Sequence, residues 1–275
     1  MTTNIKITNP DKIIFPKSKI TKLELLKYYL EISSQMLPFL ENRILSVIRC
    51  HDNINGECFF KKHPTTDKNI VEIFKDKKEE YFFISKTAQL VYQVQMGTVE
   101  FHPWASKVQN INKPDTMIFD LDPDEKLPLE KLRENVLKVK SVLDELSLES
   151  FLKTSGGKGY HIVVPFKTSK NWKKFYDFSK QVALLCESKW PNDFTTNIKK
   201  DQRKGKIFVD YLRNNRASTC VCAYSVRARE NAPISFPISW KDINEIKPNE
   251  ITIKNYKTFK NKSWKNFFET NQSLN

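Results

Sequence analysis

Two aspartates separated by one residue are the feature of this sequence most able to do chemistry. Asp120 and Asp122 lie within residues 117–124, where an apolar run passes into an Asp-Pro-Asp turn. Such a run predicts a buried strand, along which side chains alternate, so both carboxylates point to one face with Leu121 behind them. Carboxylates held so close repel unless a cation separates them, and their hard oxygens favour Mg²⁺ or Mn²⁺. Because Asp-Pro-Asp is also ordinary turn chemistry, a metal site and a solvated strand end are equal alternatives on this segment alone.

The order of strands and helices around this segment predicts where a third carboxylate lies. We expect strands at residues 116–122, 150–154, 161–166 and 206–211, with helices at 129–146 and 172–189. This β-α-β-β-α-β order predicts an α+β fold, the split βαβ (ferredoxin-like or RRM-like) unit, whose first and last strands are neighbours. Asp210 would then approach Asp120 and Asp122. Three carboxylates on adjacent strands are typical of a polymerase palm, where two metal ions activate a hydroxyl group and stabilise a leaving pyrophosphate.

A glycine-rich turn lies between two of these strands. Ser155-Gly156-Gly157-Lys158-Gly159 allows backbone N–H groups to turn toward a phosphate, and Ser155, Lys158 and His161 add a hydroxyl, a cation and an imidazole. The spacing is not that of a Walker A loop. A plain glycine hairpin is the alternative, but these polar groups opposite a carboxylate strand favour phosphate binding.

Three arginines downstream are candidates for the same ligand. Arg213 follows Asp210 by three residues, and Arg227 and Arg229 share one face of an extended segment. Guanidinium groups suit the oxygens of a triphosphate. Structural ion pairs with the carboxylates are an equal alternative.

A basic pair lies near the first predicted helix. Residues 21–24 form a capping box, and the helix that follows is expected to end near Leu37 because Pro38 comes next. Lys12 and Lys22 lie close to its start, where the amino end of a helix attracts anions. One interpretation is a phosphate pocket, and the other is two solvated lysines among many.

Aromatic residues in the first hundred positions could contact bases. Residues 44–49 are expected to form a strand ending at Arg49, and Phe59 and Phe60 lie in an extended segment after a turn. Adjacent side chains of a strand face opposite ways, so one ring can be core while the other stacks on a nucleobase. Burial of both rings is the alternative. His102 ends another strand before a proline, where a satisfied polar role is the default.

Composition limits the class of protein. The 275 residues contain 46 Lys and Arg against 32 Asp and Glu, and the net charge of +14 favours a polyanionic partner, although lysines can also serve solubility. A hydrophobic content of 39% predicts a folded protein. With no apolar run of membrane length and no signal-like N-terminus, we expect a cytoplasmic protein without a membrane partner. The five cysteines are expected to be reduced core or strand residues. They are Cys50, Cys58, Cys186, Cys220 and Cys222.

Taken together, the motifs resemble the polymerase (primase-polymerase) domain of bacterial DNA ligase D, in the archaeo-eukaryotic primase superfamily. The resemblance covers nearly the whole chain. It rests on residues 44–63, 100–102, 118–123, 153–161, 204–214 and 224–229. Two departures, in residues 216–223 and at Tyr160, affect local geometry rather than a proposed ligand.

The resemblance implies a role for each candidate residue. Asp120, Asp122 and Asp210 would bind two metal ions, with manganese favoured over magnesium. The incoming triphosphate would be held by Ser155, Lys158, His161, Arg213, Arg227 and Arg229. His102 would lie near the nucleotide sugar, which fits a preference for ribonucleotides. The DNA contacts would be Lys12 and Lys22 at the 5′-phosphate of a broken end, Phe59 and Phe60 at the template, and Arg49.

The resemblance also implies an organisation and an activity. It predicts one polymerase domain over residues 1–275, with an N-terminal α/β subdomain (1–112), a catalytic palm (113–240) and a helical C-terminal segment (241–275). The activity would be templated addition of nucleotides to 3′ ends at DNA double-strand breaks or gaps in non-homologous end joining. NTPs would be substrates, Ku and a separate ATP-dependent ligase would be partners, and the protein would work at the nucleoid.

Three other functions are compatible with the same residues. One is a stand-alone primase that starts chains de novo, and another is a DNA-end-binding module that has lost its chemistry. A metal-dependent nuclease is the third, but it does not explain a basic site of triphosphate size.

Overall fold

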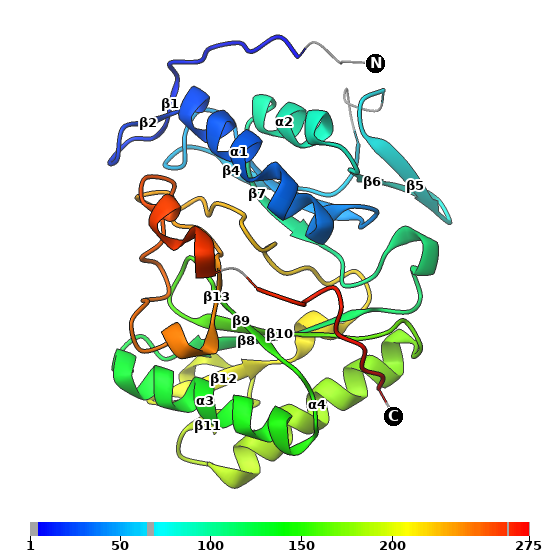
Figure 1. Ribbon diagram of the computed structural model, residues 1–275, viewed down its shortest axis with the longest axis vertical. Coiled ribbons are helices and arrows are strands. Elements are labelled where there is room, and N and C mark those ends of the chain that lie inside the picture. The colour runs from blue at the N-terminus through cyan, green and yellow to red at the C-terminus, as the bar shows by residue number, and fades with distance from the viewer. Residues whose placement is uncertain (1–4, 65–68, 263, 275) are drawn as a thin grey trace.

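Two groups of elements stack along the long axis of the molecule in the computed structural model, which describes residues 5–64, 69–262 and 264–274 (Figure 1). The N-terminal group holds the helices α1 (Lys22–Leu40) and α2 (Thr87–Gln95). The second group holds α3 (Leu129–Glu145), α4 (Trp172–Lys189) and the largest sheet. Helices and strands are therefore mixed along the chain, as the sequence predicts.

The largest sheet contains the predicted carboxylate strand at its centre. Its strands are β8 (Thr116–Pro123), β9 (Phe151–Thr154), β10 (Tyr160–Pro165), β11 (Phe194–Thr195), β12 (Ile207–Asp210) and β13 (Pro237–Ile238). They lie in the order β11-β12-β8-β10-β9-β13. β8 is antiparallel to both of its neighbours, β10 and β12. The expected contact between the first and last predicted strands is therefore confirmed.

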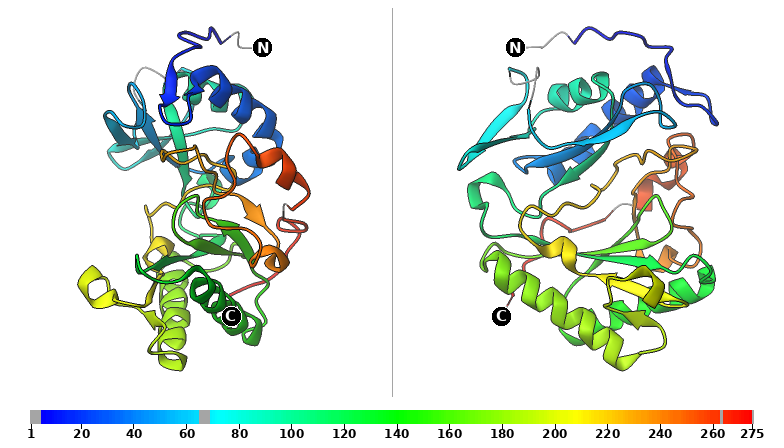
Figure 2. Two further views of the ribbon diagram at one scale, coloured as in Figure 1. Left: turned by 90° about the vertical axis from the view of Figure 1, so that its left-hand side faces the viewer. Right: turned by 180° about the vertical axis from the view of Figure 1, so that it is seen from behind.

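Apolar periodicity attaches α3 and α4 to this sheet. Val136, Val139 and Leu143 of α3 are fully buried, and Phe175 and Val182 of α4 are nearly so. Both helices lie on the same side of the sheet in all views (Figures 1 and 2), which leaves its other face toward the N-terminal group. One face of the sheet therefore packs against α3 and α4, and the other face is available for polar side chains. Within the described residues, none of the helices combines the length and the apolar character that a bilayer span requires.

Three small sheets build the N-terminal group. A three-stranded sheet has the order β4-β3-β7, and β1–β2 and β5–β6 are two-stranded. The bounds are β1 (Ile13–Phe15), β2 (Ile20–Thr21), β3 (Leu45–Cys50), β4 (Cys58–Lys61), β5 (Glu72–Asp76), β6 (Glu79–Phe83) and β7 (Thr98–Pro103). Short 3-10 helices complete the chain at η1 (Val108–Asn110), η2 (Lys200–Arg203), η3 (Leu212–Asn214), η4 (Trp240–Asp242) and η5 (Tyr256–Lys262).

The first helix begins as predicted and ends later. The Thr21 hydroxyl accepts the N–H of Glu24, and the Glu24 carboxylate accepts the N–H of Thr21, which forms the capping box. The predicted end before Pro38 is wrong, because α1 contains Pro38 and continues to Leu40. Proline removes one intrahelical hydrogen bond, and here it lies in the last turn, where the fully buried Leu40 keeps the helix in place.

Two of the five cysteines differ from the expectation. Cys50 and Cys58 lie opposite each other in the antiparallel pair β3–β4, with Cα atoms 4.1 Å apart, and form a disulfide. The prediction that they are reduced is therefore wrong for this pair, because the register places their sulfur atoms within bonding distance. Cys186, Cys220 and Cys222 are free and buried, as predicted.

Candidate functional site

The three predicted carboxylates meet on neighbouring strands. In the β8–β12 register, Asp120 lies directly opposite Asp210, and Asp122 lies opposite Phe208. Asp210 is buried, Asp120 is partly buried, and the side chain of Asp122 is about half exposed. The topology of the sheet thus brings together residues that are 90 positions apart in the sequence.

Cationic side chains contact each of these carboxylates. His161 Nε2 lies 3.2 Å from Asp120 Oδ1. Arg213 Nε lies 3.1 Å from Asp210 Oδ2 and 3.9 Å from Asp120 Oδ2, and therefore bridges the two strands. The ion-pair interpretation of Arg213 is therefore confirmed, and its contact with a triphosphate stays a prediction.

Arg203 is a partner of Asp122 that the sequence did not reveal. Its Nη1 lies 3.2 Å from Asp122 Oδ2, and its guanidinium stacks 3.8 Å above the ring of Phe208. The loop before β12 also carries several lysines, so nothing local distinguishes this one basic residue. Only the pairing of β12 with β8 places it beside a site carboxylate.

The electrostatics of the carboxylates suit a divalent cation. Burial raises the pKa values of Asp122 and Asp210, and the charge of Asp120 raises both further. Burial also opposes ionisation of Asp120, but His161, Arg213 and Lys153 together outweigh it and lower the pKa of Asp120. Among the described residues, no three His, Cys, Asp or Glu side chains converge into a ready-made metal centre. The donor set fits Mg²⁺ or Mn²⁺ in kind, while Arg203 and Arg213 balance its charge in the geometry described.

The glycine-rich turn packs tightly against β8. The Ser155 hydroxyl accepts the N–H groups of Gly157 and Gly159 at 3.0 and 3.3 Å. A Cβ atom on Gly159 would come within 2.1 Å of the Leu121 carbonyl oxygen, so only glycine allows this approach. Lys158 extends outward and pairs with Glu125 at 2.5 Å, and both of these side chains are exposed.

Glu100 is a second residue that sequence reasoning missed. It is 2% exposed, and its carboxylate accepts hydrogen bonds from His102 Nε2 at 2.9 Å, Arg227 Nε at 2.8 Å and the Ala228 N–H at 2.7 Å. Burial opposes its ionisation, but His102 and Arg227 lower the pKa of Glu100 to about 2. Arg227 also donates to the Ser155 carbonyl at 2.6 Å. The Glu-x-His spacing, which puts both side chains on one face of β7, was the available signal.

Two adjoining cavities collect the predicted residues. One, of about 520 Å³, is lined among others by Phe60, His102, Asp120 and His161. The other, of about 310 Å³, is lined by both β8 aspartates and the glycine-rich turn. Residues that line both are Asp120, His161, Arg213, Arg227 and Arg229. The arrangement places anion-binding groups directly beside the carboxylates.

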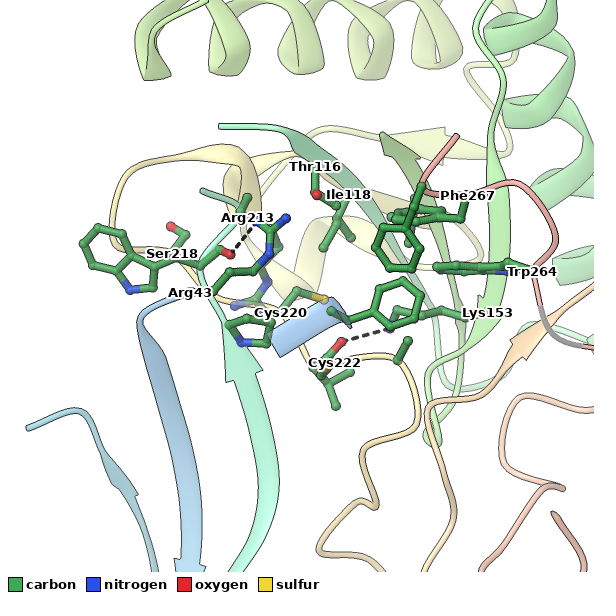
Figure 3. Close-up of a pocket in the computed structure, with 18 residues that line it drawn as sticks. Arg43, Thr116, Ile118, Lys153, Arg213, Ser218, Cys220, Cys222, Trp264 and Phe267 are labelled. Carbon is green, nitrogen blue, oxygen red and sulfur yellow. Dashed lines mark hydrogen bonds between the residues drawn. The ribbon is translucent and has the colours of Figure 1, made fainter. Parts of the chain in front are cut away.

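A third cavity lies behind this site and is mostly apolar (Figure 3). Trp264 and Phe267 from the C-terminal segment cover part of it. Arg213 and Cys220 line both this cavity and the 520 Å³ cavity, and they therefore form part of the wall between the two. Lys153 reaches into the same wall from β9.

The family comparison decides the identity of the fold. A family model described as LigD, primase-polymerase domain, matches residues 21–266. This chain belongs to the LigD primase-polymerase domain family. The resemblance drawn from the sequence motifs is thereby confirmed.

Relatives in the LigD family share the match over most of this chain. The multifunctional non-homologous end joining protein LigD of Pseudomonas aeruginosa is 37% identical over 250 residues, which are 89% of this chain and 30% of that protein. The bifunctional LigD of Bacillus subtilis is 29% identical over 241 residues, 87% of this chain and 39% of that protein. The chain thus spans roughly a third of the length of these relatives. The polymerase domain of Mycobacterium tuberculosis ligase D, solved in complex with DNA, has the same fold, with a TM-score of 0.86 and 23% identity over 93% of this chain and 94% of that one.

The lysine pair of this LigD-family chain lies outside the carboxylate site. Lys12 Nζ donates to the His51 carbonyl at 2.7 Å and lies 3.4 Å from Asp52 Oδ1. Lys22 is buried, donates to the Thr8 carbonyl at 2.8 Å, and has its pKa lowered by burial and then by the charge of Lys12. The two side chains are therefore close enough for the charge of Lys12 to lower the pKa of Lys22, and the 5′-phosphate pocket stays a prediction.

Both predicted rings of β4 are exposed in this LigD-family chain. The exposed fractions are 45% for Phe59 and 59% for Phe60. Neither the one-buried nor the both-buried alternative is correct, because β4 is the edge of its sheet and one of its faces borders the cavity. The ring of Phe60 lies 5.6 Å from that of His102, at the mouth of the cavity.

Arg49 has a structural environment. It is 8% exposed, and its guanidinium donates to Thr98 Oγ1 at 3.3 Å and to Gln93 Oε1 at 2.9 Å. Its side chain therefore supports the N-terminal sheet, and its contact with DNA stays a prediction.

Proposed function

We propose that this chain is a templated nucleotidyltransferase that adds nucleotides to 3′ ends at DNA breaks or gaps in non-homologous end joining. Membership in the LigD primase-polymerase family supports the enzyme class. The observation that carries the proposal is the direct pairing of Asp120 with Asp210 beside a cavity lined by His161 and arginines. Carboxylates for a metal and cations for a triphosphate are the two halves that such a reaction requires.

The residues of the site divide between the two halves. Asp120, Asp122 and Asp210 would hold two divalent ions, with Mn²⁺ favoured, and these would supply Lewis acidity and neutralise charge at the α-phosphate when bound. Arg227 and Arg229 would bind the triphosphate together with the adjoining Ser155 turn and Lys158. His102, fixed by Glu100, would face the nucleotide sugar. The partly buried site would exclude water from the transferred phosphate.

The division of the chain that we propose is based on the strand order of the largest sheet. β8-α3-β9-β10-α4-β12 would form a split βαβ palm, and the strand order β12-β8-β10-β9 supports this assignment. Residues 1–112 would contact the DNA end and template, 113–240 would be the palm, and 241–275 would cover the back of it. We further propose Ku and a separate ATP-dependent ligase as partners, and a cytoplasmic location at the nucleoid.

Primer extension tests the proposal. A gapped duplex with a 5′-phosphate, supplied with Mn²⁺ and NTPs or dNTPs, is expected to gain one or a few templated nucleotides. Synthesis on a template without any primer would instead support the de novo primase. Binding of the duplex with no extension under any metal would favour the end-binding module.

The 5′-phosphate is expected to be recognised through Lys12. Lys12→Ala should weaken binding of a 5′-phosphorylated gapped duplex by about tenfold, because one charge-assisted hydrogen bond is lost. Binding of the same duplex without phosphate should change little. Fluorescence anisotropy of both duplexes measures this. Lys17→Ala is the matched control, since Lys17 is an exposed lysine paired with Glu230. Equal losses on both duplexes would contradict the pocket.

Phe60 is expected to stack on a template base. Phe60→Ala should reduce affinity for a duplex with a single-stranded template by roughly 5- to 150-fold, since stacking on an aromatic ring contributes about 1–3 kcal/mol per base. Phe268→Ala is the control, because Phe268 has nearly the same exposure, 60%, but lies in the C-terminal segment. Similar affinities for the two variants would exclude a template role for Phe60.

A further inference from the structure

The disulfide of the N-terminal group lies beside the proposed DNA contacts. Cys50 and Cys58 are opposite each other at the end of the β3–β4 ladder, and their bond closes a loop over residues 51–57. Cys50 is 1% exposed, whereas Cys58 is partly exposed and lines the 520 Å³ cavity. A small thiol or disulfide that enters the cavity therefore approaches the pair from the Cys58 side.

One end of this loop is attached to the lysine that we assign to the 5′-phosphate. Lys12 Nζ donates to the His51 carbonyl at 2.7 Å and lies 3.4 Å from Asp52 Oδ1. In the middle of the loop, the Ile54 N–H donates to the Ile14 carbonyl of β1 at 3.0 Å. The position of the Lys12 ammonium group therefore depends on the conformation of the loop.

The other end of the loop continues directly into the two exposed rings. Phe59 and Phe60 follow Cys58 in β4, which forms the edge of its sheet beside β3. An edge strand has a hydrogen-bonded neighbour on one side alone, so a covalent link to β3 restricts its motion strongly. Reduction removes that link and leaves β4 held by backbone hydrogen bonds and side-chain packing. The disulfide thus fixes the phosphate lysine at one end of the loop and the rings at the other.

We propose that the Cys50–Cys58 pair is a redox switch that strengthens binding of a DNA end when it is oxidised and weakens it when it is reduced. The inference rests on the DNA contacts of the proposed function. In the cytoplasmic location proposed above, most thiols are kept reduced, and a disulfide there is typically transient or redox-sensing. The pair therefore transmits the thiol–disulfide balance of the cell to the surface that contacts DNA.

The chemistry of the switch is thiol–disulfide exchange with a small disulfide such as oxidised glutathione. The Cys58 thiolate attacks one sulfur of the oxidant, and one glutathione thiolate leaves. The Cys50 thiolate then attacks the Cys58 sulfur of the mixed disulfide, and the second glutathione thiolate leaves. The two protein thiols are oxidised, and the oxidant is reduced to two glutathione thiols that take up the two protons. A dithiol reductant reverses both steps.

The unaltered chain provides the first test. One sample is equilibrated with oxidised glutathione and another with dithiothreitol, and alkylation in denaturant should count three free thiols in the first and five in the second. Fluorescence anisotropy then measures binding of a gapped duplex with a 5′-phosphate. We expect the oxidised chain to bind about fivefold more tightly or better, because reduction frees two contacts that were preorganised. Equal affinities, or five free thiols in the oxidised sample, would overturn the proposal.

Two variants assign the effect to this pair of cysteines. Cys58→Ser cannot form the bond, so it should bind DNA with the affinity of the reduced chain under both conditions. Cys220→Ala is the matched control, because Cys220 is a free thiol that lines the same cavity. It should retain the difference between oxidised and reduced samples. A Cys58→Ser chain that still responds to oxidised glutathione, or a Cys220→Ala chain that no longer responds, would contradict the assignment.

Hydrogen exchange measures the structural change in the absence of DNA. The amide protons of residues 51–61 should exchange about tenfold faster in the reduced chain, because local opening of the loop and of β4 requires less free energy. Those of β8, in the other group of elements, should exchange at the same rate in both samples. Equal exchange of residues 51–61 in the two samples would reject the loop and β4 as the parts that move.

Primer extension on the same two samples separates this inference from the proposed function. If DNA affinity depends on the redox state but no nucleotide is added, the switch holds and the proposed chemistry fails. If nucleotides are added and both samples bind DNA equally, the chemistry holds and the switch fails.

Discussion

Replacing Asp120 by alanine is expected to lower nucleotide addition by a factor on the order of 10³ or more while the chain stays folded. Asp120 lies at the centre of the site, opposite Asp210 and two residues before Asp122. Its removal takes away the carboxylate that lies next to both of the other proposed metal ligands. The fold should tolerate this, because burial and the charge of Asp120 raise the pKa values of the two remaining carboxyl groups, and that repulsion disappears.

Primer extension with Mn²⁺ and a thermal melt of the same sample measure both parts of this prediction. Binding of Mn²⁺, followed by electron paramagnetic resonance, should weaken in parallel with activity. Asp124→Ala is the control, since Asp124 lies in the adjacent turn and its carboxylate accepts a backbone N–H from Lys126. Extension by Asp120→Ala at a rate close to that of the Asp124 control would contradict the assignment of Asp120 as a metal ligand.

Replacing Glu100 by glutamine is expected to destabilise the chain by roughly 3 kcal/mol at neutral pH. A carboxyl group whose pKa falls from 4.5 to about 2 on folding contributes approximately this amount to the free energy of unfolding. The pKa is lowered, so the contribution is complete above pH 4.5 and is lost as the pH falls toward 2. The variant and the wild type should therefore differ fully at pH 7, differ by less than half as much at pH 3, and converge as the pH falls below 2.

Urea unfolding at pH 7 and at pH 3 measures the effect. Glu230→Gln is the control, because Glu230 is an exposed partner of Lys17 and such pairs contribute less than about 1 kcal/mol. Glu100→Gln should also raise KM for the nucleotide, since His102 and Arg227 lose the group that orients them. A difference in stability that is as large at pH 3 as at pH 7 would refute the electrostatic explanation.

The sequence predicts the centre of the site well because local patterns and topology suffice there. Apolar runs and turn residues indicate β8 and β12, and the order of elements implies that these strands pair. The sequence therefore predicts the proximity that the structure has for Asp120, Asp122 and Asp210. Lys153 appears in the same motif, but nothing in the sequence says that its ammonium points inward.

The supporting residues escape prediction because their partners are distant in the chain. Glu100 binds Arg227, 127 residues later, and Arg203 binds Asp122, 81 residues earlier. No periodicity or spacing rule covers such separations. The exposure of Phe59 and the disulfide of Cys50 have the same origin, since both depend on which strand forms the edge of a sheet and in what register.

The long-range closure of the pocket has a consequence for synthesis of the protein on the ribosome. Segments 218–223 and 224–236 complete the cavity, and they close it through Arg227 on Glu100 and Ser235 on Lys153. About 235 residues must therefore leave the ribosome before the nucleotide pocket can exist. Until then, Glu100 and Lys153 are charged groups without their final partners inside a nascent chain, and we expect this part of the protein to order last.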